Sequence, residues 1–124
     1  MKFCIYQINL DRDTERLAFA GMDDLQQYHG SAEIPSNLYD KVYEGDSDLS
    51  NLEDLFRLLN FNHPDDYFAR SMSVSDVVEI KEGGTQEESP GFYYCDSVGF
   101  RKIDFRPEQA GPYESDVGMR MTGY

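Results

Sequence analysis

The most regular pattern of hydrophobic and polar positions lies between Ser71 and Phe105. Its first part predicts a strand, because all but one of the even positions on one face are apolar: Met72, Val74, Val78 and Ile80. Asp76 is the exception, and a carboxylate on an apolar face requires hydrogen bonds. Hydroxyl and amide groups nearby can supply them, so Ser73, Ser75 and Asp76 are interpreted as a structural turn that starts the strand.

Two more strands are predicted in the second part of this stretch, over Phe92–Asp96 and Gly99–Phe105. Ser97, Val98 and Gly99 alone separate Asp96 from Phe100. A connection of three residues that ends in Gly is typical of a β-hairpin whose last loop residue adopts a positive φ. Asp96, Ser97 and Gly99 are therefore interpreted as hairpin residues.

The N-terminal part of the chain predicts three short strands and one short helix. Phe3–Leu10 is mostly apolar on both faces, so it is expected in the middle of a sheet. Leu17–Ala20 is predicted as a short second strand, and Asp23 or Asp24 is expected to open a helix that runs through Tyr28. In the predicted strand Tyr39–Glu44, Tyr39, Lys41 and Tyr43 share one side and Val42 takes the other.

The main helix begins after an acidic linker. The sequence Ser50–Glu53 matches a capping box, in which a Ser hydroxyl and a Glu carboxylate satisfy free backbone amides. Four apolar residues then recur at helical spacing: Leu52, Leu55, Phe56 and Leu59. Asn60, Asn62 and Pro64 are expected to end the helix, and Asp65–Ala69 is predicted to add one helical turn.

These elements predict an α+β fold. We expect a small mixed or mainly antiparallel sheet with a C-terminal β-hairpin or meander and one main amphipathic helix packed on it. Residues 1–105 are predicted to form this domain. Residues 106–124 show no periodicity and contain Pro and Gly, so they are predicted to be a tail or a strap over the core.

The charge of the chain restricts its partners. The 124 residues carry 24 Asp and Glu against 11 Lys and Arg, a net charge of −13. Phosphate contacts require a basic surface, so direct binding of nucleic acid and of anionic membranes is not expected. A basic protein is the natural partner; the alternative is that the charge only keeps the protein soluble. The acidic surface also opposes close self-association, which predicts a monomer or a weak dimer.

No constellation of residues predicts catalysis, a cofactor or a metal. The two histidines, His29 and His63, have no Cys pair at zinc-ligand spacing. Cys4 and Cys95 each lie in a predicted apolar strand and are expected to be buried free thiols in a reducing cytoplasm, although a disulfide is possible if the two strands pair. The N-terminus has no signal peptide, so the predicted location is cytoplasmic. We therefore expect that the protein is not an enzyme.

An ordered set of motifs resembles the YodL-like domain family. They are S-V-S-D-V-V at Ser73–Val78, Y-Y-C-D-S-V-G-F at Tyr93–Phe100, I-Y-Q-I at Ile5–Ile8, Y-D-K-V-Y-E-G at Tyr39–Gly45, L-E-D-L-F at Leu52–Phe56 and F-N-H-P-D-D-Y at Phe61–Tyr67. The resemblance spans residues 3 to 105. It implies a small accessory protein of conjugative elements and phage-like islands, and it brings no catalytic residues.

Charge and resemblance together suggest an anti-defence inhibitor. In this hypothesis carboxylates stand in for phosphates and occupy the basic nucleic-acid surface of a CRISPR or restriction nuclease. The candidate partner-binding acids are Asp11, Asp13, Asp23, Asp24, Asp46, Asp48, Asp65, Asp66, Glu87 and Glu88. The alternative is an adaptor of the element's own transfer or replication machinery, which binds a protein through its aromatic-rich sheet face. An enzyme would instead need a deep pocket that converges on Asp76, Asp96 and a Tyr hydroxyl.

Overall fold

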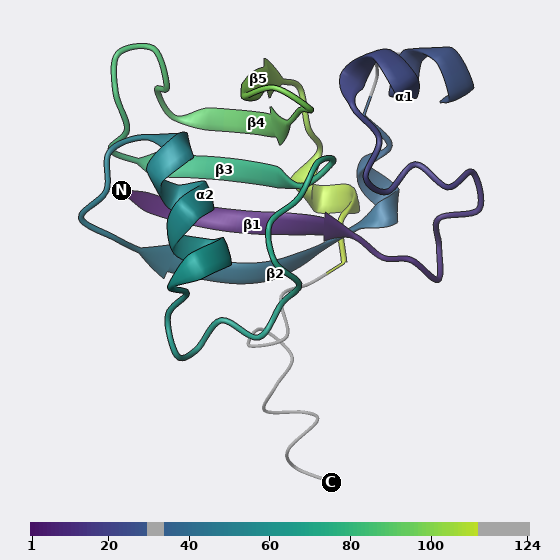
Figure 1. The fold of residues 1–124 in the computed structure, drawn as a ribbon. Helices are drawn as coiled ribbons and strands as arrows, with labels where there is room; N and C mark the ends of the chain where they lie inside the picture. Colours follow the sequence, from purple (N-terminus) through teal and green to yellow (C-terminus); the bar gives the residue numbers. More distant parts are fainter. Residues whose placement is uncertain (30–33, 112–124) are drawn as a thin grey trace, which may run out of the picture.

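One five-stranded sheet with a helix on its front face dominates the computed structural model, which describes residues 1–29 and 34–111 (Figure 1). The elements in chain order are β1 (Lys2–Ile8), α1 (Met22–His29), β2 (Tyr39–Asp46), α2 (Leu52–Phe61), β3 (Val77–Glu82), β4 (Gly91–Cys95) and β5 (Phe100–Ile103). Short 3₁₀ turns cover Ser36–Leu38 and Pro107–Gln109. The strand order is β2-β1-β3-β4-β5 and every neighbouring pair is antiparallel, so the predicted α+β fold with its C-terminal meander is confirmed.

Strand β1 lies inside the sheet, as its two apolar faces predict. It pairs with β2 on one side and with β3 on the other. Phe3 and Ile5 contribute to the core on the front face, and Cys4, Tyr6 and Ile8 contribute to the core on the back face. The strand ends at Ile8, two residues before the predicted end at Leu10.

A β-bulge in β2 overturns the predicted side-chain alternation of that strand. Ile5 pairs with Tyr43 and the next residue, Tyr6, pairs with Lys41, so one residue of β2 has no partner on β1. The extra residue moves Tyr43 into the front core, whereas Tyr39 lies in the back core. Tyr39 and Tyr43 are therefore on opposite faces, because the simple period of two fails across a bulge.

Helix α2 covers the front face and buries Leu52, Leu55 and Leu59 completely. Its N-cap is Asn51, whose side-chain oxygen accepts a hydrogen bond from the amide of Asp54 at 2.9 Å. The predicted capping box at Ser50 is wrong, because the helix begins one residue later than the motif requires. Glu88, from the loop between β3 and β4, adds a second cap by accepting a hydrogen bond from the amide of Leu52 at 2.8 Å.

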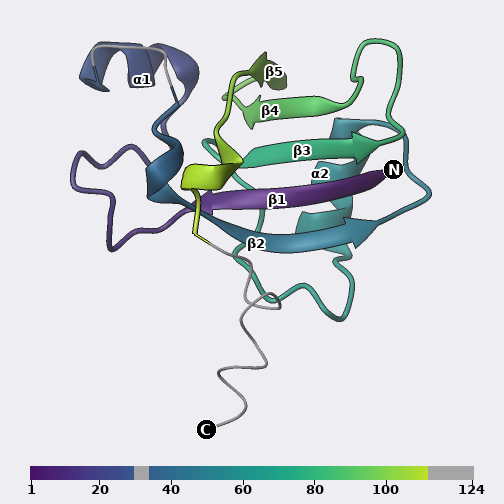
Figure 2. The same ribbon diagram turned by 180° about the vertical axis from the view of Figure 1, so that it is seen from behind.

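The back face of the sheet is covered at one end by loop segments (Figure 2). Leu17, Leu25, Ile34 and Phe105 complete the second core there. Leu17–Ala20 is not a strand, contrary to prediction. Both carboxylate oxygens of Asp13 instead accept hydrogen bonds from the backbone of this segment, namely from the amides of Leu17 and Ala18 at 2.7 and 2.8 Å. These bonds hold the backbone in turns, and α1 follows close to its predicted position.

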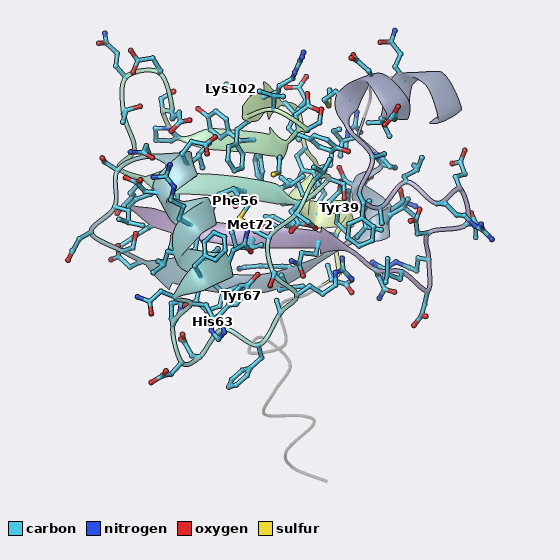
Figure 3. All side chains as sticks on the ribbon, viewed as in Figure 1. Tyr39, Phe56, His63, Tyr67, Met72 and Lys102 are labelled. Carbon is cyan, nitrogen blue, oxygen red and sulfur yellow. The ribbon has the colours of Figure 1, made fainter. Side chains whose placement is uncertain are left out.

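The chain after α2 also differs from prediction. Residues 65–69 form no helical turn, because the chain runs back along α2 as a loop. This loop contains a single turn, in which the amide of Tyr67 donates to the carbonyl of Pro64 at 3.0 Å. Tyr67 is buried and contacts the ring of Tyr43 at 5.1 Å between centroids. Figure 3 shows Tyr67 and His63 next to each other below α2.

The chain beyond β5 returns along the edge of β2. The backbone of Gly111 forms a parallel bridge with Asp40, donating to the carbonyl of Tyr39 at 2.8 Å and accepting from the amide of Lys41 at 3.0 Å. This part therefore lies against the domain as a strap. The rest of the predicted tail, residues 112–124, lies outside the described residues.

Both cysteines are buried and free. Cys4 lies in β1 and Cys95 in β4, and β3 separates these two strands, so the pairing on which a disulfide depended does not occur. Among the described residues, no helix has the length and apolar character needed to cross a membrane.

Candidate protein-binding surface

The residues from Ser73 to Asp76 form a turn at the start of β3. Asp76 is completely buried, and its Oδ2 accepts hydrogen bonds from the amide of Ser73 and from Nε2 of Gln7, both at 3.0 Å. The amide of Asp76 in turn bonds the carbonyl of Ser73 at 3.1 Å. Ser75 adopts a φ of 84°, and its hydroxyl accepts from the amide of Phe19 at 2.9 Å. The turn thereby connects β1, β3 and the loop before α1.

The carboxyl group of Asp76 is unusual because it lies in the protein interior with one oxygen, Oδ1, that accepts no hydrogen bond from the described residues. Burial raises its pKa to about 7, although the bonds from Ser73 and Gln7 and the charge of Arg70 act in the opposite direction. A buried acid of this kind is also a feature of some active sites. The Asp76 carboxylate is buried away from solvent, and its hydrogen bonds come from Ser73 in the turn and from Gln7 in β1.

Asp96 connects the β4–β5 hairpin to helix α1. Its Oδ1 accepts hydrogen bonds from the amides of Met22, at the start of α1, and of Ser97, at 3.0 and 2.7 Å. Its Oδ2 lies 2.6 Å from Nε of Arg101. Burial opposes the charge of Asp96, but these partners outweigh it and lower its pKa. Gly99 closes the hairpin with a φ of 71°, and its carbonyl accepts from the amide of Asp96 at 2.9 Å.

A small charged cluster covers the thiol of Cys4 on the back of the sheet. The thiol donates to Glu44 at 3.2 Å, and the ammonium groups of Lys41 and Lys81 lie 2.8 and 3.2 Å from the same carboxylate oxygen. Burial raises the pKa of the Cys4 thiol to about 12, and burial also raises that of Cys95 to about 12. Both thiols are therefore protonated at neutral pH and are poor nucleophiles.

The ten predicted partner-binding acids lie in three separate places (Figure 1). Four acids lie at one end of the sheet, at the end of β2, in the segment after it and between β3 and β4: Asp46, Asp48, Glu87 and Glu88. Those at the opposite end, in the loop after β1 and in α1, are Asp11, Asp13, Asp23 and Asp24. Asp65 and Asp66 lie in the loop after α2. The structure does not bring the ten residues together into one site.

Four of these ten acids have partners within the molecule. Asp13 and Glu88 accept hydrogen bonds from backbone amides, Asp66 accepts one from the hydroxyl of Tyr43 at 2.9 Å, and Asp46 lies 3.7 Å from the N-terminal ammonium group. The other six are exposed and have no hydrogen bond or ion pair from a side chain of the described residues: Asp11, Asp23, Asp24, Asp48, Asp65 and Glu87. These six carboxylates are free to meet a partner.

Large apolar side chains are also exposed on this acidic molecule, at positions that the sequence pattern does not single out, with the exception of Phe61. Phe61 is 82% exposed at the end of α2, Phe68 is 90% exposed in the following loop, and Val98 is 89% exposed at the tip of the β4–β5 hairpin. The exposure of Phe61 could have been predicted from helical spacing. Phe61 follows Leu52 by nine residues, and at about 100° per residue this places it on the opposite face of the helix. The aromatic side chains of the sheet, by contrast, are mostly buried: Tyr6, Tyr39, Tyr43, Tyr93 and Tyr94 all lie in the core.

Three surface cavities are lined by a mixture of polar and apolar residues. A cavity of about 580 Å³ lies between Arg12, Asn37 and Arg106, and one of about 390 Å³ lies between Met22, Ile34 and Lys102. A third, of about 260 Å³, lies between Asn9, Asp40 and Arg70. Neither Asp76 nor Asp96 lines any of the three, and no group of three or more His, Cys, Asp or Glu among the described residues could hold a metal ion.

The family model of the YodL-like domain matches residues 2–105, which is most of the chain and all five strands. The chain belongs to the YodL-like domain family. No curated protein and no solved structure matches it. The matched region of this YodL-like domain includes the turn at Asp76, the hairpin at Asp96 and the loop after α2, so all three are parts of the domain itself.

Proposed function

We propose that this YodL-like domain is a non-enzymatic, acidic protein-binding module whose partner is a basic protein. The observation that supports the proposal most directly is the set of six exposed carboxylates that have no side-chain partner among the residues the structure describes. Charged side chains of this kind stay solvated in the free protein and can form ion pairs when a cationic surface approaches. The net charge of −13 would also speed the encounter with such a partner.

The most concrete form of this proposal is an anti-defence inhibitor that occupies the basic nucleic-acid surface of a CRISPR or restriction nuclease. Carboxylates can replace phosphates in contacts with Lys and Arg. Because the acids lie in three separate places, each place would have to contact a different part of the nuclease in this form. In this form the domain acts in the cytoplasm as a monomer or a weak dimer.

The inhibitor form is tested by DNA cleavage assays with purified CRISPR and restriction nucleases. We expect that the domain slows cleavage by a susceptible nuclease, and that inhibition weakens when salt is raised from 50 to 300 mM. Neutralising Asp23, Asp24 and Asp48 to Asn should weaken inhibition at least tenfold. Asp13→Asn is the matched control, because this acid is engaged with backbone amides. If no nuclease of the panel is bound or inhibited, the inhibitor form is wrong.

A second candidate is an adaptor of the transfer or replication machinery of a mobile element. The exposure of Phe61 and Phe68 favours it, because a phosphate mimic has no use for exposed aromatic rings. The two candidates differ in which substitutions weaken binding. Alanine at the exposed Phe residues would matter most for an adaptor, and amides at the exposed acids would matter most for a nuclease inhibitor.

A further inference from the structure

The last residue of α2 and the loop that follows it display two phenylalanines that the core does not use. Phe61 is 82% exposed and Phe68 is 90% exposed, whereas six of the tyrosines are buried. Exposed side chains of this size forgo the stabilisation that burial of an aromatic ring would bring. The core is already closed on this side by Leu59, Tyr67 and Met72, so neither phenylalanine is needed to complete it. We name residues 61–68, with both rings, the docking loop.

Several contacts hold the docking loop in one conformation. Tyr67 lies between the two phenylalanines in the sequence and is buried in the core. Its hydroxyl donates to the carbonyl of Arg70. The hydroxyl of Tyr43 in β2 donates to Asp66, and Nδ2 of Asn60 donates to the carbonyl of Met72 at 3.0 Å. A loop fixed in this way loses little conformational entropy when it binds, which favours recognition.

The charge of the docking loop indicates the chemistry of its partner. Asp65 and Asp66 lie exposed between the two phenylalanines, and no Lys or Arg occurs from Leu58 to Ala69. A complementary surface therefore has apolar sockets for two rings beside Lys or Arg side chains. A second copy of this chain fits poorly as the partner. In a symmetric contact Asp65 and Asp66 of one copy would face Asp65 and Asp66 of the other, and two chains of charge −13 would come together.

We propose that the docking loop is the surface by which this domain binds its basic protein partner, with Phe61 and Phe68 inserted into apolar sockets and Asp65 and Asp66 paired with cations around them. This inference rests on the proposed function and specifies where it is exercised. It assigns most of the binding energy to the two rings, because buried aromatic anchors dominate interfaces and exposed ion pairs contribute little.

The experiment uses the full chain with a photo-crosslinking residue in cells that carry its natural partners. p-Benzoylphenylalanine replaces Phe61 or Phe68 in the docking loop, and in control chains it replaces Val98, Asp23, Asp48 or Glu87. All six side chains are exposed, so the variants are expected to fold. We expect that positions 61 and 68 crosslink to the same protein, that this protein carries net positive charge, and that position 98 does not crosslink to it.

The outcomes separate the docking loop from the proposed function. Crosslinks to a basic protein from Asp23, Asp48 or Glu87 but not from positions 61 and 68 would overturn the docking loop and leave the proposed function intact. Crosslinks from positions 61 and 68 to a second copy of the chain, to an acidic protein or to lipid would overturn the docking loop as a site for a basic partner. If no position crosslinks to a basic protein, the proposed function fails as well.

Calorimetry with the purified crosslinked protein then measures how the binding energy is distributed. Phe61→Ala and Phe68→Ala should each weaken binding at least tenfold, and the double variant at least a hundredfold. Val98→Ala is the matched control, since it removes an equally exposed apolar side chain and should change the Kd less than twofold. Equal effects at position 98 and in the docking loop would contradict the proposal.

Discussion

At the scale of single residues, the fold depends on a few polar groups that the chain buries. Asp76 holds the start of β3 to Gln7 of β1, and Asp96 holds the start of α1 to the β4–β5 hairpin. The two carboxylates differ in their environment. Asp96 has a cation, Arg101, as a direct partner and its pKa is lowered, whereas Asp76 has only dipolar partners in direct contact and its pKa is raised to about 7.

The raised pKa of Asp76 makes stability depend on pH. In the unfolded chain the group has its ordinary pKa of 3.8, so between pH 4 and 7 the folded state binds the extra proton. The stabilisation is complete below the unfolded pKa and is lost as pH rises through about 7. From pH 5 to pH 8 this loss amounts to about 3 kcal/mol, because each pKa unit corresponds to about 1.4 kcal/mol.

Asp76→Asn isolates this effect, because Asn does not titrate. We expect that the unfolding free energy of the natural chain, minus that of Asp76→Asn, falls by about 3 kcal/mol between pH 5 and pH 8 in urea titrations. The subtraction removes the contribution of the other acids, which both chains share. A difference that stays constant over this range would show that Asp76 is ionised in the folded protein throughout.

Gly99 provides a test of backbone strain without side-chain clashes. Its φ is 71°, and a Cβ built there would meet nothing within 4 Å. We therefore expect Gly99→Ala to lower the unfolding free energy by about 1 kcal/mol through the left-handed conformation alone. Gly99→Asn is the matched variant and should lose less, because Asn tolerates this conformation better. Equal losses for Ala and Asn in chemical denaturation would refute this explanation.

At the scale of elements, periodicity predicted the five strands and α2, but it also predicted a strand at Leu17–Ala20 and a helical turn at Asp65–Ala69 that do not form. Periodicity did not reveal the contacts that fix the ends of the elements. The stripe of apolar residues in α2 was evident from spacing, and all but Phe56 of its members are fully buried. The cap was misplaced because Ser50 and Asn51 are both good caps, and the choice depends on the path of the preceding loop. The cap from Glu88 depends on a residue 36 positions away, and no local pattern can reveal it.

The N-cap of α2 can be tested with two neighbouring substitutions. Asn51→Ala removes the acceptor for the amide of Asp54 and should lower the unfolding free energy by about 1 kcal/mol. Ser50→Ala should change it by less than half of that, because Ser50 is exposed and precedes the cap. Thermal denaturation followed by circular dichroism measures both. A larger loss for Ser50→Ala would restore the capping box that the sequence suggested.

Elsewhere, tertiary contacts overrode local patterns. The bulge in β2 changes the face of Tyr39 relative to Tyr43, and a strand that is apolar on both sides gives no signal of such a shift. Leu17–Ala20 has the composition of a strand, but Asp13 binds its backbone amides and leaves no edge for pairing. The candidate surface was predicted only as a list of acids, because the position of each acid on the fold depends on strand order.

At the scale of the whole molecule, the acids divide into two groups that sequence cannot distinguish. Asp11, Asp48 and Glu87 are exposed and have no side-chain partner within residues 1–29 and 34–111, whereas Asp13 and Glu88 bind backbone amides. Each acid of either group contributes one negative charge to the net charge of −13. The acids of the first group add charge repulsion to the folded state without a compensating contact, so they lower its stability. The same acids are available to pair with a binding partner.

This division predicts opposite responses to neutralisation. The triple variant Asp11→Asn, Asp48→Asn and Glu87→Gln should raise the unfolding free energy by about 1 kcal/mol at 20 mM salt, because it relieves repulsion between like charges. This gain should disappear at 500 mM salt, where charges more than a few ångströms apart are screened. Asp13→Ala and Glu88→Ala should each lower the unfolding free energy by about 1 kcal/mol relative to the natural chain, at both salt concentrations. Each substitution removes hydrogen bonds from backbone amides, at 2.7 to 2.8 Å, that salt does not replace. Urea unfolding of the three variants at the two salt concentrations measures this. If Asp13→Ala and Glu88→Ala stabilise the chain as the triple variant does, all the acids act as one diffuse charge and the division into two groups is wrong.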